Sequence, residues 1–157
     1  MIEYPVIFSG PMVRSILSGS KTQARMLPSP LWDSAAMHIE DGDPVWLWVR
    51  PLDGAKEPLL WASRLMLGVL SMRLERLQDI SHDDALAEGI QRDSSAFMQA
   101  GWWHYGGATL ANGDPANVTT DPRLSFAGLW DRLHHKPGKT WADNPEVWRI
   151  EVRRTSQ

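Results

Sequence analysis

The segment FSGPMVRSILSGSKTQ, residues 8–23, carries the signals of a helix and of the extended chain that follows it. It follows a short apolar run, and Pro11 is suited to the first turn of a helix. The apolar residues after it are spaced so that they share one helical face; they are Met12, Val13, Ile16 and Leu17. Gly19 supplies the stop expected just past a helix end. The stretch therefore predicts a helix, followed by an extended segment over residues 21–26.

Beyond this stretch, the middle of the chain predicts strands. Residues 45–49 follow a turn and repeat with a period of two, with apolar side chains on both sides, which predicts a buried strand. The Asp53-Gly54 pair indicates a reversal into a second strand near residues 59–62. Residues 65–77 fit a helix or a strand by their spacing, and we favour a strand with a bulge near Gly68.

Three later segments complete the predicted elements. Ser81 and Asp84 have the spacing of a cap at the start of a short helix, which Gly89 closes. Residues 126–133 carry the apolar stripe of an amphipathic helix. In residues 148–152 apolar side chains alternate with charged ones, which predicts a final half-buried strand. Several strands and three helices together indicate an α+β domain.

Length and composition limit the class of protein. A chain of 157 residues has the length of a single domain. It contains no cysteine, which excludes disulfides, thiolate nucleophiles and cysteine-based metal sites. No stretch approaches the ~20 apolar residues that span a bilayer, so we expect a cytoplasmic protein with no membrane partner. The net charge of -3 argues against non-specific coating of duplex nucleic acid, and leaves a small ligand or a short single strand open.

Residues 91–122 are polar, rich in glycine and asparagine, and too long for an ordinary connection in a compact domain. They predict a lid, a binding loop or disorder. Trp102, Trp103 and Tyr105 lie together there, and exposed aromatic rings could stack on a base at about 1 to 3 kcal/mol each. A cluster that anchors the loop to the rest of the domain explains these residues equally well.

Four segments carry an ordered pattern that is more specific than any single motif. They are residues 8–23, residues 41–50 with DGDPVWLWVR, residues 76–90 with RLQDI and EGI, and residues 129–152 with LW, W and NPEVW. The pattern resembles that of ASCH-domain proteins, including versions common in phages and prophages. The resemblance implies a small PUA-like β-barrel flanked by about three helices. It also implies a cleft that receives RNA or a nucleobase in related domains.

Some ASCH proteins are amidohydrolases that remove an acyl group from modified cytidine, using a Lys, a Thr and a Glu. Lys21 matches the Lys and Glu88 matches the Glu, but Ala24 stands where the family has its second Thr. Ala24 has no hydroxyl, and Thr22 lies roughly 6 to 7 Å away along an extended segment, too far for a simple replacement. A water molecule activated by Lys21 is the remaining route to hydrolysis.

The segment over residues 19–25 is the expected wall of the cleft, with Lys21, Gln23 and Arg25 as its ligand-binding side chains. Simpler interpretations stay open for each charge. Lys21 could be a solvated cation past a helix end, Glu88 an exposed helix carboxylate, and Arg25 the partner of a structural carboxylate.

We expect no metal or other cofactor. The residues that could suggest a metal are His82, Asp83, Asp84, His134 and His135. Adjacent positions on a helix point in different directions, so these side chains do not converge. Capping and surface exposure explain them better.

Three functions are compatible with the sequence. The favoured one is a module that binds RNA or a modified nucleoside in the cleft. The second is a hydrolase that uses Lys21 and Glu88, acting as an amidohydrolase on acylated cytidine or as a ribonuclease on single-stranded RNA. The third is a protein-interaction role, in which a protein partner contacts the tryptophan-rich loop.

Overall fold

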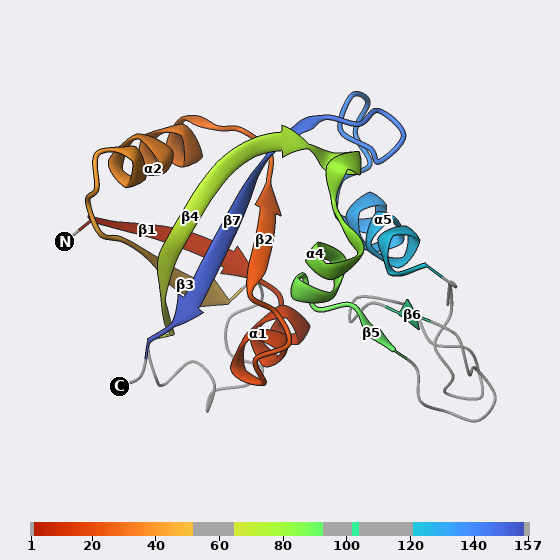
Figure 1. Cartoon of the computed structure of the whole chain (residues 1–157), viewed down its shortest axis with the longest axis horizontal. Coiled ribbons are helices and arrows are strands. Elements are labelled where there is room, and N and C mark those ends of the chain that lie inside the picture. Colours follow the sequence, from red (N-terminus) through yellow and green to blue (C-terminus); the bar gives the residue numbers. More distant parts are fainter. Residues whose placement is uncertain (1, 52–64, 93–101, 104–120, 156–157) are drawn as a thin grey trace. The chain divides into compact units, whose positions relative to one another are not determined.

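The computed structural model describes residues 2–51, 65–92, 102–103 and 121–155. The chain divides into two compact units. The first consists of residues 1–75 and 146–157, and the second of residues 76–145. Figure 1 shows that the first unit carries a sheet and the second carries mainly helices and short strands. The single domain expected over the whole chain stays a prediction, and the strand expected near residues 59–62 lies outside the described residues.

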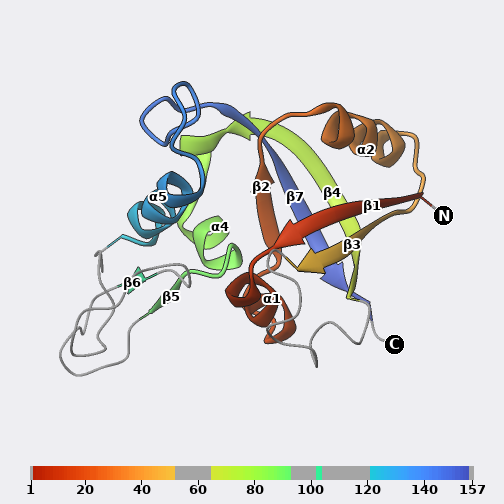
Figure 2. The same cartoon turned by 180° about the vertical axis from the view of Figure 1, so that it is seen from behind.

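The first unit is built on a mixed sheet of five strands. In spatial order these are β1 (Ile2–Phe8), β3 (Val45–Pro51), β4 (Met66–Arg76), β7 (Glu146–Arg154) and β2 (Gln23–Met26). β1 pairs with β3 in parallel, whereas β3 with β4 and β2 with β7 are antiparallel pairs. Figure 2 shows the same sheet from behind.

The predicted α+β class is confirmed, but the predicted small barrel is not. Closing a sheet into a barrel requires its first and last strands to pair with each other. Here β1 and β2 stand at the two ends of a linear order, and the described strands do not join them. The sheet is therefore open. Four α-helices occur among the described residues, where three were predicted.

Two of these helices belong to the first unit. α1 (Gly10–Leu17) begins at Ser9, whose hydroxyl accepts a hydrogen bond from a helix amide. Gly19 follows the end of α1 with a φ of +86°, a conformation that other residues adopt only at a cost of about 1 to 2 kcal/mol. Both features confirm the predicted helix and its stop. α2 (Pro30–Glu40) was missed from the sequence, although Ser29 caps it in the same way.

The hydrophobic core joins the sheet to both helices. β3 contributes every second residue, Val45, Leu47 and Val49, as its period of two predicts. α1 adds Ile16 and α2 adds Trp32. Burying an aliphatic or aromatic side chain of this size contributes about 1.5 to 3 kcal/mol. This core fixes the positions of β2 and β7, the two strands that carry the candidate site.

The strand predicted over residues 65–77 is confirmed as β4, with one difference. Its register with β3 runs through Gly68, opposite Trp46, without a bulge between these paired residues. A Cβ atom at Gly68 would lie 3.3 Å from the Trp46 ring, so the absence of a side chain lets the ring approach closely. Val69 and Met72 are three positions apart, yet both pack on the core. The alternation of core-facing and outward-facing side chains in β4 therefore shifts between them, beyond Gly68.

The second unit contains the other two helices. α4 (His82–Ala87) begins at Ser81, whose hydroxyl accepts from the Asp84 amide at 3.0 Å, which confirms the predicted cap. α5 (Pro122–Leu133) buries Phe126 and Trp130 on the predicted stripe. Of the helices in the described part of the chain, none has the length and apolar character needed to cross a membrane.

Short elements fill the rest of the second unit. The 3-10 helix η1 (Leu77–Asp79) precedes α4, and Arg123 donates to the main-chain oxygens of Gln78 and Ile80 at 2.6 Å each. β5 (Gln91–Arg92) and β6 (Trp102–Trp103) form an antiparallel pair. In the long segment over residues 91–122, residues 93–101 and 104–120 lie outside the described residues. The role of this segment as a lid or binding loop therefore stays a prediction.

Candidate functional site

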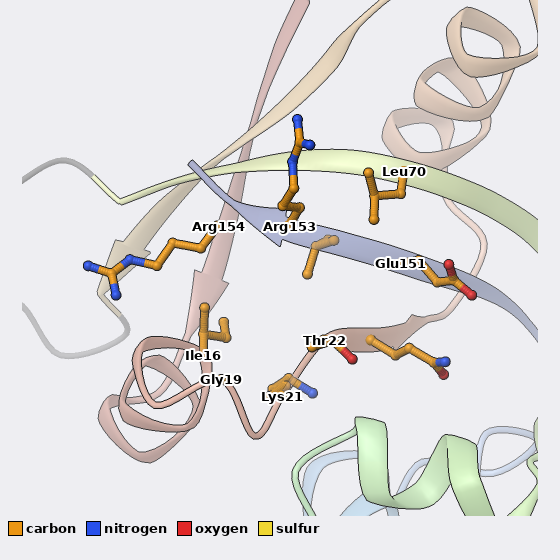
Figure 3. Close-up of a pocket in the computed structure, with 10 residues that line it drawn as sticks. Ile16, Gly19, Lys21, Thr22, Leu70, Glu151, Arg153 and Arg154 are labelled. Carbon is orange, nitrogen blue, oxygen red and sulfur yellow. The ribbon is translucent and has the colours of Figure 1, made fainter. Parts of the chain in front are cut away.

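A cleft of about 570 Å³ lies in the first unit, beside the segment that the sequence singled out. Figure 3 shows its lining on α1, on the residues leading into β2, on β4 and on β7. The lining residues are Ile16, Gly19, Lys21, Thr22, Gln23, Leu70, Glu151, Val152, Arg153 and Arg154. The cleft therefore combines apolar side chains with side chains of both charges.

Main-chain hydrogen bonds hold Lys21 at the wall of this cleft. Its amide donates to the carbonyl oxygen of Ser15 on α1 at 3.0 Å, and the next carbonyl, of Thr22, accepts from the Val152 amide at 3.0 Å. Lys21 is only 4% exposed. A buried ammonium group is costly unless its surroundings supply hydrogen bonds or counter-charges. Lys21 is thus a built-in part of the cleft, and the interpretation as a solvated cation does not hold.

Thr22 and Ala24 lie in different surroundings. Thr22 is exposed and lines the cleft. Ala24 is 3% exposed, stands opposite Ile150 of β7 and belongs to the hydrophobic core. Side chains alternate across a strand, so Ala24 faces the core while Gln23 and Arg25 face the other side. A threonine at position 24 would direct its hydroxyl into the core of this fold.

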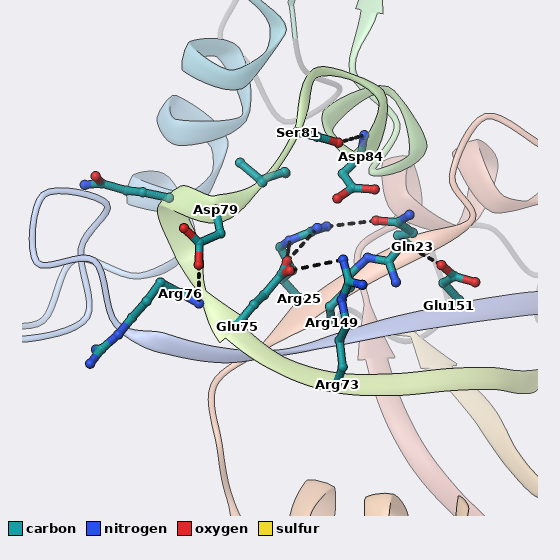
Figure 4. A network of polar contacts seen from close by, with 12 residues as sticks. Gln23, Arg25, Arg73, Glu75, Arg76, Asp79, Ser81, Asp84, Arg149 and Glu151 are labelled. Atoms are coloured by element: carbon teal, nitrogen blue, oxygen red, sulfur yellow. Dashed lines mark hydrogen bonds and ion pairs between the residues drawn. The ribbon is translucent and has the colours of Figure 1, made fainter.

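A row of polar side chains follows the opposite face of β2 (Figure 4). The side chain of Arg25 is fully buried and donates from Nε and Nη2 to Oε1 of Glu75, at 3.1 and 2.9 Å. Its Nη1 donates to Oε1 of Gln23 at 3.1 Å. Arg73 lies 3.5 Å from the other oxygen of Glu75. Arg25 therefore forms the structural ion pair that was one of its two interpretations, and it does not line the cleft.

The same contacts orient Gln23. Because its Oε1 accepts from Arg25, the amide group has one fixed orientation. Gln23 is 7% exposed and lines the cleft next to Lys21. Arg25 is thus a positioning residue for Gln23. The ligand-binding role predicted for Gln23 stays a proposal.

The sequence missed three charged residues of the cleft, all on β7. Glu151 lies opposite Gln23 and forms an ion pair with Arg149. Arg153 and Arg154 follow at the end of the strand. The alternation of the final strand gives these residues a polar face. It does not reveal that this face borders the cleft, because that depends on the pairing of two strands far apart in the sequence.

Glu88 belongs to the second unit. It occupies the C-cap of α4 and is 3% exposed, so it is not the exposed helix carboxylate that one interpretation expected. Its predicted cooperation with Lys21 joins two units and stays a prediction. The stacking role of the aromatic cluster also stays a prediction. Trp102 and Trp103 form β6, and Tyr105 lies outside the described residues.

The groups considered for a metal do not converge. In the part of the chain that the structure describes, no cluster of three or more His, Asp or Glu side chains could hold a metal ion. His82 is exposed on α4, while the ring centroid of His134 lies 3.9 Å from that of Trp130. Burial lowers the pKa of His134 below its ordinary value, and the positive charges of Lys139 and His135 add smaller effects.

This shift predicts how His134 contributes to the pH dependence of stability. Its folded-state pKa lies below the unfolded value of about 6.5, so the unfolded chain takes up the proton first as the pH falls. As the pH falls, we expect the free energy of unfolding to decrease, beginning near the pKa of His134 in the unfolded chain and ending near its pKa in the folded protein. Urea unfolding of wild type and His134→Asn over this range should show a weaker pH dependence in the variant. An equal dependence in both proteins would contradict the assignment, and His82→Asn serves as the exposed control.

A solved ASCH-domain structure shares this fold. The ASCH domain from Lactobacillus crispatus JV V101 aligns with 98% of this chain and 79% of its own, at 13% identity and a TM-score of 0.51. A protein from Enterococcus faecalis V583 aligns with 91% of this chain and 66% of its own, at 9% identity and a TM-score of 0.45. No protein-family model and no curated protein sequence matches the chain. The chain thus has the fold of an ASCH domain, which confirms at the level of the fold the resemblance carried by its four segments.

Proposed function

We propose that the chain binds RNA or a modified nucleoside in the cleft of the first unit. The observation that carries this proposal is the burial of Lys21 at the wall of a cleft of about 570 Å³. Beside it, Gln23 is held in one orientation by Arg25. An ammonium group and an amide N–H are donors suited to the carbonyl oxygens and ring nitrogens on the edge of a base.

The other lining residues suit a flat heterocycle. Ile16, Leu70 and Val152 give the cleft apolar surface, against which the face of a base can lie. Leu70 is 55% exposed, so this surface is open to a ligand. The resemblance to ASCH domains supports the same conclusion, because it implies a cleft that receives RNA or a nucleobase.

A hydrolase acting on acylated cytidine or on single-stranded RNA is the second candidate. The burial of both Lys21 and Glu88, at 4% and 3% exposure, favours it, because burying a charged side chain is costly and is retained where it is needed. Amide hydrolysis requires an activated nucleophile and a proton donor for the departing amine. With Ala24 in the core, the nucleophile would be a water molecule or the exposed hydroxyl of Thr22. Lys21 would take its proton and Glu88 would protonate the leaving amine.

Lys21→Met tests the cleft itself. Methionine keeps much of the apolar stem but removes the donors, so we expect binding at least about tenfold weaker, or about 1.4 kcal/mol. The ligands are a panel of modified nucleosides and short single-stranded RNAs, with complex formation and turnover both followed by mass spectrometry. Lys136→Met, which changes an exposed lysine of the second unit, is the matched control.

The outcomes separate the candidates. Binding without turnover in the wild type supports a binding module, and turnover that disappears in Lys21→Met supports the hydrolase. If Lys21→Met matches the wild type in both measurements, the cleft is not the site. A protein partner at the long segment over residues 91–122 would then be the next hypothesis to test.

Thr22→Val distinguishes the two cleft functions further. The change replaces the hydroxyl with a methyl group of similar size, so in a binding module we expect affinity to change by less than about threefold, within the value of one neutral hydrogen bond. If Thr22 is the nucleophile, the same change should abolish turnover while binding persists. Affinity and turnover measured on the same protein sample give the answer, and Thr22→Ser should retain turnover in the second case.

A further inference from the structure

We propose that Arg153 and Arg154 form an anion subsite at the end of the cleft, so that the ligand is a phosphorylated nucleoside and not a free nucleoside. This inference rests on the proposed function and adds the chemical class of the ligand. The shared chemistry is one phosphate group attached to a nucleoside. It could come from a free mononucleotide or from a nucleotide within single-stranded RNA.

The arginines of the polar face fall into two groups. Three of them contact a carboxylate, since Arg25 and Arg73 share Glu75, and Arg149 contacts Glu151. At the end of β7, by contrast, neither Arg153 nor Arg154 has a carboxylate partner among the residues that the structure describes. The positive charge at this end of the cleft is therefore not compensated locally.

The two side chains leave β7 on opposite sides, so they offer two separate contacts for phosphate at this end of the cleft. Both line the cleft and both are exposed. Neighbouring residues of a strand point to opposite sides, and Figure 3 shows the two side chains diverging from the end of β7. Nη1 of Arg154 donates to the carbonyl oxygen of Leu17 at 3.4 Å, which holds this side chain beside the end of α1. A guanidinium group has five N–H donors, so donors remain for a phosphate, which it can bind through two parallel hydrogen bonds.

The two ends of the cleft differ in charge. Glu151, the carboxylate in the lining, lies opposite Gln23 and is matched by Arg149, whereas the Arg153 end is positive. The whole chain carries a net charge of -3, so this positive spot is a local feature and not a consequence of a basic protein. Two guanidinium groups suffice for one or two phosphates, which fits a nucleotide better than a long duplex. The base would then lie toward Lys21 and Gln23, with its phosphate at the Arg153 end.

The test compares ligands that differ only in phosphate. Calorimetry would measure the affinities of uridine and cytidine, of their 5′ and 3′ monophosphates, and of a short single-stranded RNA. We expect the phosphorylated compounds to bind at least about tenfold tighter than the nucleosides in the wild type. Raising the salt about fourfold should weaken them about three- to sevenfold, as expected for one or two phosphate contacts. Arg153→Gln, Arg154→Gln or both should reduce the preference for phosphate.

A matched variant and the ligand series make each result decisive. Arg132→Gln removes an exposed arginine of α5 in the second unit and should leave the preference unchanged. Equal affinities for nucleosides and their phosphates would overturn the subsite while leaving the proposed function intact. A preference that survives in both Arg153→Gln and Arg154→Gln would also overturn it. A preference seen with RNA but not with mononucleotides would support the subsite and identify an internal phosphodiester as its ligand. If none of these compounds binds, the proposed function fails and the subsite with it.

Discussion

Replacing Arg25 by methionine should lower the free energy of unfolding by about 3 to 5 kcal/mol, because it leaves the carboxylate of Glu75 without its main counter-charge. The side chain of Arg25 is fully buried and that of Glu75 is only 10% exposed, so water cannot take over this role cheaply. Arg73, 61% exposed and 3.5 Å away, is a poor substitute. In a chain of this length the melting temperature should fall by about 6 to 20 °C, which thermal or urea unfolding would measure.

Two further variants identify the cause of this loss. In the double variant Arg25→Met with Glu75→Met, both charges are gone, and we expect a smaller loss than the sum of the two single changes. Arg132→Met changes an exposed arginine and should alter stability by less than about 0.5 kcal/mol. A cost of Arg25→Met as small as that of Arg132→Met would show that the ion pair contributes little.

Ala24→Thr should destabilise the protein by about 2 to 6 kcal/mol and should not create hydrolytic activity. Overfilling a packed core costs about 1 to 3 kcal/mol, and burying an unpaired hydroxyl costs about 1 to 3 kcal/mol more. The physical reason is the position of Ala24, which is 3% exposed, faces the core and stands opposite Ile150. The measurements are urea unfolding and mass-spectrometric assay of acylated cytidine.

Ala24→Val is the control, because valine has nearly the shape of threonine without the hydroxyl. The difference in stability between the two variants isolates the polar contribution, which should be about 1 to 3 kcal/mol. If Ala24→Thr is as stable as the wild type and gains turnover, then position 24 faces the cleft and the assignment of Ala24 to the core is wrong.

Features that depend on neighbouring residues were predictable from the sequence. The cap at Ser81 and the stop at Gly19 use a side chain or a backbone angle within one turn of the helix end. The period of two in residues 45–49 predicted the strand β3 for the same reason, but apolar residues on both sides left open which of them are buried. α2 was missed despite a comparable signal, a serine before a proline at Ser29.

Features that depend on pairing between distant strands were not predictable in this way. Hydrophobic period shows which face of a strand is buried but not which strand lies beside it, so the open strand order had to come from the structure. The contact of Arg25 with Glu75 and the position of Glu151 at the cleft depend on that order. The resemblance to ASCH domains located Lys21, but it could not show that Ala24 faces away from the cleft.

The place of β7 in the sheet has a consequence for how the protein is made. β7 lies between β4 and β2, so residues 146–154 complete the sheet although they are synthesised long after β2. While the chain is still emerging from the ribosome, β2 has no partner and one wall of the cleft does not exist. A nascent chain therefore cannot hold ligand in this cleft until residue 154 has left the ribosome. Ribosome-bound chains stopped before β7 should be sensitive to protease in their early segments. Chains with a C-terminal extension long enough to bring β7 out of the ribosome should be protected.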